Sequence, residues 1–472
     1  DGTAAGSILT LATDLEIIDG ITVDDGETLD IGTNTLTVNG SIDFAAGGAN
    51  LGVLEFTTGA KLEVNGTVAA QNNWPTLNPD AASATAITDL DLTIAGSGIN
   101  ALGALPTTYV GFDDVIMNRV NQTLEFGAAA TVGSLQIISG TVQAEEDADF
   151  TVTGTTNIQA SGTFDGSSGT ATAIRTRTFT SNLSGSGTLD LEGNDATGLI
   201  RGVFATGCNF TFTGDLETNG FTDLFIESTQ TSDFLIPSTV ERVYRLKYDR
   251  GANARTVTLS HDLEIDGPTT AVEFAQGTLQ LNGYTLTFDG NFATAATNAL
   301  INAANSSEMV FNGIADFTNP TASEITVDET TDITFGGGPA AITNFPAFSE
   351  LNNLAIETTG QRTLTLTDDL TLSGNLVLNG NGTDVNALLV AGANILTIEG
   401  NVVNSGSLNI VGTDVFFRGT MEGMGTYTSD ATTDITIDGT GSMFQLSSGI
   451  TTLGTLKLDR SAGMRLNGDL WV

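Results

Sequence analysis

The densest group of carboxylates in the chain lies at Glu145, Glu146, Asp147 and Asp149. Hard cations such as Ca²⁺ prefer several oxygen ligands that a turn gathers together. The sequence therefore predicts a calcium site at these four residues, and it predicts no other cofactor. Neither an EF-hand loop nor a glycine-rich calcium-binding nonapeptide array occurs in the chain.

Basic side chains gather in one short segment. Five of the 15 basic residues lie between positions 242 and 255. Exposed ion pairs between arginine and carboxylate are common and individually weak. In so acidic a chain, we expect this cluster to pair with the acidic surface of its own or a neighbouring subunit. We predict an inter-subunit contact at Arg242, Arg245 and Arg250.

Residues suited to nucleophilic or acid–base catalysis are scarce. His261 is the sole histidine, and related segments carry Thr13 and Thr367 at its place, so an ordinary turn residue is expected. Cys208 is the sole cysteine, and its alternating surroundings predict a buried, inert thiol. With His261 interpreted in this way, the sequence offers no Ser–His–Asp triad and no zinc site of ordinary ligation.

Paired carboxylates suggest one further chemistry, because two suitably placed acids hydrolyse glycosides. Such pairs occur at Asp24–Asp25 and Asp113–Asp114 and within 145–147. All of them fall between expected strands, where acidic residues commonly serve turns and solubility. We therefore expect no catalytic residues and no enzyme.

The charge balance narrows the choice of partners. The chain has 56 acidic and 15 basic residues, a formal net charge of −41. A uniformly negative surface repels nucleic acid and anionic lipid, so neither is an expected partner. No segment approaches 18 consecutive apolar residues, so membrane insertion is not expected.

The elements that would position these residues are short strands. Apolar and polar residues alternate over four to seven positions at many places, which predicts half-buried strands. Asn–Gly and Asp–Gly steps between them accept positive φ and close tight turns. Clear examples of the alternation are 36–38, 135–137, 189–191, 279–281 and 435–437.

Three phrases recur in the same order along the chain. One of them is an alternating strand followed by an arginine, at Arg119, Arg250 and Arg460, with Arg362 arriving late in the remaining copy. The spacing indicates a period of about 100–135 residues, longer than that of ordinary solenoid repeats. We predict repeats at 1–122, 123–255, 256–362 and 363–472, the last including the start of another copy. Since neither end resembles a cap, we expect a window on a longer array or ends that join head to tail.

Two all-β architectures fit these observations. The favoured one is a β-helix or β-solenoid, in which short parallel strands stack coil upon coil around a Leu/Ile/Val/Phe core. The alternative is a string of β-sandwich domains, one to each repeat. The stretch 71–80 is expected to form a loop on one face. Most phenylalanines occupy alternating inward positions, which favours ladders of rings inside the coils.

The recurring phrases resemble repeats of very large surface proteins of Bacteroidota that the type IX secretion system exports. The matching residues are 456–461, Asp369–Leu370 and 277–290. This family includes gliding adhesins and filamentous grappling hooks. The resemblance implies an extracellular, cell-surface location and a role in adhesion.

The predicted function is therefore that of a structural shaft segment of a bacterial surface filament or adhesin, which attaches cells to surfaces or to other cells. Expected partners are further copies of the chain and a cell-surface or glycan target. The alternative is a carbohydrate-binding or carbohydrate-cleaving β-helix. Exposed Trp or Tyr platforms would favour that alternative, but the chain has only two Trp and five Tyr.

Overall fold

The computed structural model forms two compact units, Asp1–Gln230 and Thr231–Val472. Every regular element is a β-strand in the described residues, and no helix there has the length and apolar character needed to cross a membrane. The described residues are 6–44, 51–68, 70, 73–79, 89–96, 102–167, 173–195, 197–229, 233–250, 255–267, 272–293, 299–318, 325–338, 340–357, 360–380, 387–390, 393–423, 425–439, 444–446, 449–461 and 464–466.

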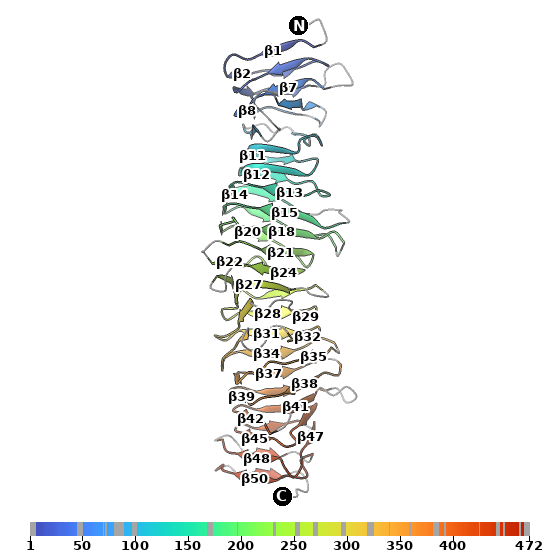
Figure 1. Cartoon of the computed structure of the whole chain (residues 1–472), viewed down its shortest axis with the longest axis vertical. Coiled ribbons are helices and arrows are strands. Elements are labelled where there is room, and N and C mark those ends of the chain that lie inside the picture. The colour runs from blue at the N-terminus through green and yellow to red at the C-terminus, as the bar shows by residue number, and fades with distance from the viewer. Residues whose placement is uncertain are drawn as a thin grey trace. The chain divides into compact units, whose positions relative to one another are not determined.

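The first unit is a stack of coils made of short strands joined by turns (Figure 1). Its strands are β1 (Ile8–Thr10), β2 (Leu15–Ile17), β3 (Gly20–Thr22), β4 (Thr28–Asp30), β5 (Thr35–Val38), β6 (Ser41–Asp43), β7 (Val53–Phe56), β8 (Ala60–Val64), β9 (Thr76–Pro79), β10 (Leu90–Ile94), β11 (Gly111–Glu125), β12 (Ala130–Gln143), β13 (Phe150–Val152), β14 (Thr156–Asp165), β15 (Arg175–Phe179), β16 (Leu183–Gly185), β17 (Thr188–Asp190), β18 (Ile200–Phe204), β19 (Phe210–Phe212), β20 (Asp215–Glu217) and β21 (Thr222–Ile226).

The second unit is built in the same way (Figure 1). Its strands are β22 (Phe234–Ile236), β23 (Arg242–Val243), β24 (Arg245–Asp249), β25 (Thr256–Leu259), β26 (Leu263–Ile265), β27 (Val272–Gln280), β28 (Thr285–Phe288), β29 (Phe292–Ala293), β30 (Ala299–Asn302), β31 (Glu308–Phe311), β32 (Ala315–Asp316), β33 (Ile325–Thr326), β34 (Asp332–Phe335), β35 (Ile342–Thr343), β36 (Glu350–Leu351), β37 (Leu354–Ile356), β38 (Thr363–Leu366), β39 (Leu370–Leu372), β40 (Leu376–Leu378), β41 (Ala387–Val390), β42 (Ile395–Ile398), β43 (Val402–Asn404), β44 (Ser407–Asn409), β45 (Asp414–Phe417), β46 (Met421–Glu422), β47 (Thr426–Thr428), β48 (Asp434–Ile437), β49 (Phe444–Leu446), β50 (Thr455–Leu458) and β51 (Met464–Leu466).

Strands of successive coils pair in parallel and in register. In unit 2, Leu286 of β28 pairs with Met309 of β31, which pairs in turn with Ile333 of β34. In unit 1, Leu29 of β4 pairs with Leu54 of β7 in the same way. Sandwich domains consist of antiparallel sheets, so the sandwich alternative is wrong, and each unit is a β-solenoid. The predicted fold class is confirmed.

The strand alternation directs apolar side chains into the coils. In β31 the burial pattern alternates, so that Met309 and Phe311 are buried while Glu308 and Val310 face outward. The coil repeat is short: the backbone N–H of Thr285 donates to Asp262 at a sequence separation of 23 residues. Each predicted long repeat therefore spans several coils, although the exact repeat boundaries stay a prediction.

Aromatic rings form ladders along the core, as predicted. In unit 2, Phe288, Phe311 and Phe335 stack with ring centroids 5.2 and 5.5 Å apart. Unit 1 contains a longer series of neighbouring rings, most of them edge to face. Its members are Trp74, Tyr109, Phe112, Phe126, Phe150, Phe164, Phe179, Phe204, Phe210 and Phe212. Aromatic pairs in such geometries stabilise a core beyond the area that they bury.

The loop expected at 71–80 is wrong for its described part. Thr76–Pro79 forms strand β9, which pairs with β7. Trp74 is fully buried beside Tyr109, whose hydroxyl donates to the carbonyl of Pro75. Burial of the large indole draws this segment onto the coil stack, although its two prolines and several amides suggested a loop. Residues 71, 72 and 80, and residues 467–472 at the end of the last predicted repeat, lie outside the described part.

Candidate functional site

The predicted calcium ligands lie in the turn between β12 and β13. Asp147 forms an ion pair with Arg175, at 3.3 Å, and the carboxylate of Asp149 accepts the backbone N–H of Thr176 at 2.7 Å. Within the described residues, a set of three acidic groups close enough to share a metal ion does not occur in this turn. Asp147 and Asp149 thus contact residues of the next coil instead of converging on a common point. Calcium binding at this turn stays a prediction without geometric support.

A buried arginine anchors the same turn from inside. Arg177 is fully buried, and its guanidinium donates to the carbonyls of Gly166 (2.9 Å), Glu145 (3.0 Å) and Ala148. Burial lowers the pKa of Arg177 to about 10, which leaves the side chain charged at neutral pH. Backbone carbonyls of the acidic turn therefore accept hydrogen bonds from the buried, positively charged side chain of Arg177.

The structure gathers a different acidic cluster beside Arg242. Glu264 and Asp266 belong to the coil of β26 and Asp289 to the next coil, and their nearest carboxylate oxygens lie within 4.8 Å of one another. Arg242 contacts Glu264 at 2.7 Å and Asp266 at 3.1 Å. Burial raises the pKa of Asp266 to about 6, and the nearby acids add to this shift. The guanidinium supplies the positive charge that a metal ion would otherwise bring.

The three arginines predicted at an inter-subunit contact have different environments. Arg242 has about half of its side chain exposed and pairs within its own chain. Arg245 is partly exposed on β24. Arg250 is only 1% exposed, so an inter-subunit ion pair through its side chain does not fit the structure. For Arg242 and Arg245, the contact stays a prediction.

Arg250 belongs to a set of buried arginines that the sequence analysis did not assign to the core. Arg362 donates to four carbonyls, those of Gly338, Phe311, Asn312 and Gly313, at 2.7–3.2 Å. These acceptors lie at the end of β31 or just after β31 and β34, in the two coils that precede its own. The members of the set are Arg119, Arg177, Arg250, Arg362 and Arg460.

Arg119 makes the equivalent contacts in unit 1. It donates to the carbonyls of Ala95, which follows β10, and of Val64 and Gly66, which lie at and just after the end of β8; these are the two preceding coils. Arg460 similarly reaches the carbonyls of Arg418 and Gly419. A guanidinium offers five donors in a rigid fork, so one side chain satisfies several carbonyls at once. Arg119 and Arg362 each tie three coils together.

A signal for these residues was present in the sequence. In the phrases that end at Arg119, Arg250 and Arg460, the arginine stands two positions after an apolar residue of an alternating strand. That parity places it on the inward side of the coil. Its charge suggested a surface position, whereas the hydrogen-bonding capacity of the guanidinium allows it inside.

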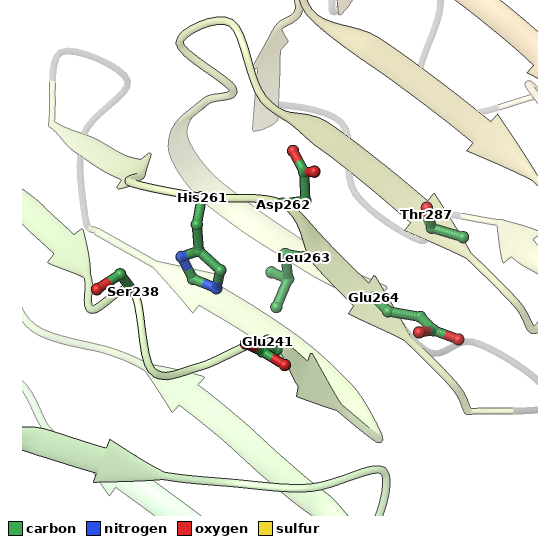
Figure 2. Close-up of a pocket in the computed structure, with 7 residues that line it drawn as sticks. All are labelled: Ser238, Glu241, His261, Asp262, Leu263, Glu264 and Thr287. Carbon is green, nitrogen blue, oxygen red and sulfur yellow. The ribbon is translucent and has the colours of Figure 1, made fainter.

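His261 lines a shallow hollow of about 410 Å³ together with Ser238, Glu241 and Glu264. Its Nε2 donates to the carbonyl of Val240 at 2.6 Å. Figure 2 shows His261 and the adjacent Asp262 pointing in opposite directions, and the carboxylate of Asp262 accepts the backbone N–H of Thr285. The two side chains therefore do not form an acid–base pair, and both stabilise turns.

A partly exposed phenylalanine faces outward from β45 in unit 2. Phe416 of β45 lies in the register between Thr397 of β42 and Thr436 of β48. Its neighbours Val415 and Phe417 point into the core, and the Phe416 ring is partly exposed. Beside this row, Arg418 contacts Glu399 and Asp438. The face thus combines an aromatic surface with hydroxyl and charged groups.

These features define a β-solenoid repeat protein with charged turns and internal arginine clamps. A comparison with protein-family models, curated proteins and solved structures found no match to this chain.

Proposed function

We propose that the chain is a structural shaft segment of an extracellular bacterial surface filament or adhesin, which attaches cells to surfaces or other cells. The observation that carries this proposal is the set of buried arginines. Arg119 and Arg362 each join a coil to the two before it. Pulling adjacent coils apart would expose a charged group and several carbonyls whose partners are lost, which costs free energy.

The surface charge supports the same function. The net charge of −41 keeps long acidic surfaces soluble and apart from one another. The resemblance of the recurring phrases to surface proteins of Bacteroidota supports an extracellular location. Repeated copies of such a shaft would give avidity to weak individual contacts.

The direct test uses cells that express the protein. Antibody fragments against residues 102–167 and 340–357 are added to intact source cells before an attachment assay. We expect both fragments to label the cells and to reduce attachment, whereas fragments against a cytoplasmic protein do neither. If the antigen became accessible only after the cells were permeabilised, the proposed location and function would be wrong.

The outward Phe416 favours carbohydrate binding as a second candidate function. An exposed ring that is flanked by hydroxyl groups offers a stacking surface and hydrogen-bond partners to a sugar. We expect a Phe416→Ala variant to lose binding to a neutral glycan array, while Val403→Ala on another sheet retains it. If neither the parent chain nor the variant bound any glycan, this candidate would be eliminated.

A further inference from the structure

One sheet of unit 2 presents a continuous outward row of side chains. The sheet runs β23–β26–β28–β31–β34–β37–β40–β43–β46, and Figure 1 shows several of these strands stacked in order. The register aligns one outward residue from each strand: Arg242, Glu264, Thr287, Val310, Thr334, Ala355, Val377, Val403 and Glu422.

Six consecutive members of this row, from Thr287 to Val403, carry no charge. They are threonine, valine or alanine; Val403 is 37% exposed, Thr287, Val310, Thr334 and Val377 are half-buried, and Ala355 is 9% exposed. In a chain of net charge −41, most approaching surfaces would meet carboxylates. An uncharged, largely β-branched row is the kind of surface that packs against another sheet. We call the sheet surface centred on this row the neutral face, although its flanking rows include carboxylates.

We propose that the neutral face packs against the same face of a second copy of this chain, with the two coil stacks antiparallel. A two-fold axis through Thr334, the middle residue of the row, generates this arrangement. It is an isologous contact, in which each pair of residues occurs twice. This inference deepens the proposed shaft function by naming a partner, and it rests on that function for its biological meaning.

Charge complementarity selects the antiparallel arrangement. With the axis at Thr334, Arg242 at one end of the row lies opposite Glu422 of the second copy. In a parallel arrangement, Arg242 would face Arg242 and Glu264 would face Glu264, and such like-charge pairs oppose association. Arg242 already contacts Glu264 and Asp266 of its own chain, so Glu422 would share this guanidinium with them, while Glu264 lies opposite the uncharged Val403 instead of a second Glu264.

The flanking rows are complementary in the same arrangement. Glu308 lies opposite Asn353, and Asp289 lies opposite Asn379, so carboxylates meet amide donors. Asp332 meets its own counterpart near the axis. Its carboxylate accepts the side-chain amides of Asn352 and Asn353, both at 2.8 Å, which offsets the repulsion.

The size of the face suits a specific but weak contact. Nine strands at about 4.8 Å, each contributing five residues at about 3.3 Å, give roughly 700 Å² for each copy. A stable interface of standard size buries about 800 Å² on each partner. We therefore expect reversible dimers of the full chain. In a bundle of several shafts, many such contacts acting together would bind more tightly than one.

Sedimentation of the purified full chain over a range of concentrations tests the proposal. We expect a monomer–dimer equilibrium whose Kd rises at least tenfold in Val310→Glu/Val377→Glu, because the added carboxylates would be buried against uncharged residues of the second copy. The matched control, Thr371→Glu/Thr436→Glu, adds the same charge on the sheet of Phe416 and should leave the Kd unchanged. A chain that is monomeric at every concentration, or equal weakening by both variants, would overturn the proposal.

Cross-linking tests the orientation of the two copies. In the antiparallel dimer, Thr334→Cys lies opposite itself across sheets about 10 Å apart. A bismaleimide of that span should link it into dimers, whereas the parent chain, whose Cys208 is buried, and Thr371→Cys should stay monomeric. Absence of the Thr334→Cys dimer in a sample that sediments as a dimer would exclude this axis. These tests use purified protein and address only the dimer. If they failed, the proposed shaft function would still be tested separately by the antibody experiment on cells.

Discussion

Arginine is the residue through which this chain joins one coil to the next. Arg119, Arg177 and Arg362 all donate to main-chain carbonyls from inside the solenoid. A parallel coil stack has turns at which carbonyls leave the sheet ladder, and these groups need donors when they are buried. The guanidinium reaches several of them at once and stays ionised, which a lysine in the same place would not match.

Replacing Arg362 by methionine should destabilise the protein strongly. The change leaves four carbonyls without their donor and removes a buried side chain, at a cost of about 3 kcal/mol. Calorimetry should show a clearly lowered Tm. Arg418→Met is the matched control, because Arg418 is 40% exposed and its loss removes only surface ion pairs, worth under about 1 kcal/mol. Equal losses of Tm in the two variants would refute the stabilising role of the hydrogen bonds from Arg362 to the four carbonyls.

Asp266 should give the protein an unusual response to acid. Its pKa is raised from 3.8 to about 6 in the folded protein, because burial disfavours the charged carboxylate. Between these values the folded state binds more protons than the unfolded state, so this residue stabilises the fold as the pH falls. The Asp266→Asn variant should gain less Tm than the parent chain between about pH 7 and pH 5. A larger gain in the variant would contradict the assignment.

At the residue scale, the sequence predicted the roles of single residues better than it predicted which residues lie close together. The buried thiol of Cys208 and the turn role of His261 follow from their immediate neighbours, and the structure places both residues as predicted. The cluster of Glu264, Asp266 and Asp289 could not be predicted, because Asp289 comes from a different coil than the other two residues. Only the register between coils brings such residues together.

At the scale of the strand, side-chain ladders reinforce the main-chain register. Asn353, Asn375 and Asn401 occupy equivalent places in successive coils. The backbone N–H of Asn375 donates to Oδ1 of Asn353, and that of Asn401 donates to Oδ1 of Asn375. The row ends at Thr420, which donates to Asn401. Each amide thus fixes the start of the next strand, and a slip of one residue would break the row.

The Asn375→Ala variant should loosen β37 and β40 locally. It removes the acceptor for Asn401 and the donor to Asn353, so we expect the backbone amides of Leu354 and Leu376 to exchange about tenfold faster, equivalent to about 1.4 kcal/mol. Hydrogen exchange of the native protein measures this. Asn312→Ala on the same sheet, which removes one exposed contact to Asp289, serves as the control. Unchanged exchange at Leu354 and Leu376 would show that the ladder is incidental.

At the scale of the whole molecule, alternation and the repeated phrases were enough to predict a coil stack. They could not predict how many residues make one coil, because a long period contains several coils of differing sequence. They also misplaced the segment around Trp74, since two prolines normally indicate a loop and only tertiary packing reveals that the indole is buried. The described strands of both units nevertheless share one pattern, in which most inward side chains are apolar and buried arginines are the main charged exceptions.

The central claim is that these coils form a shaft that withstands pulling, and single-molecule force spectroscopy of the full chain tests it most directly. We predict stepwise release of coils at high force. In Arg362→Met, the steps from unit 2 should occur at lower force, while those from unit 1 keep their force. Extension at low force without steps, or an identical profile for Arg362→Met, would contradict the account.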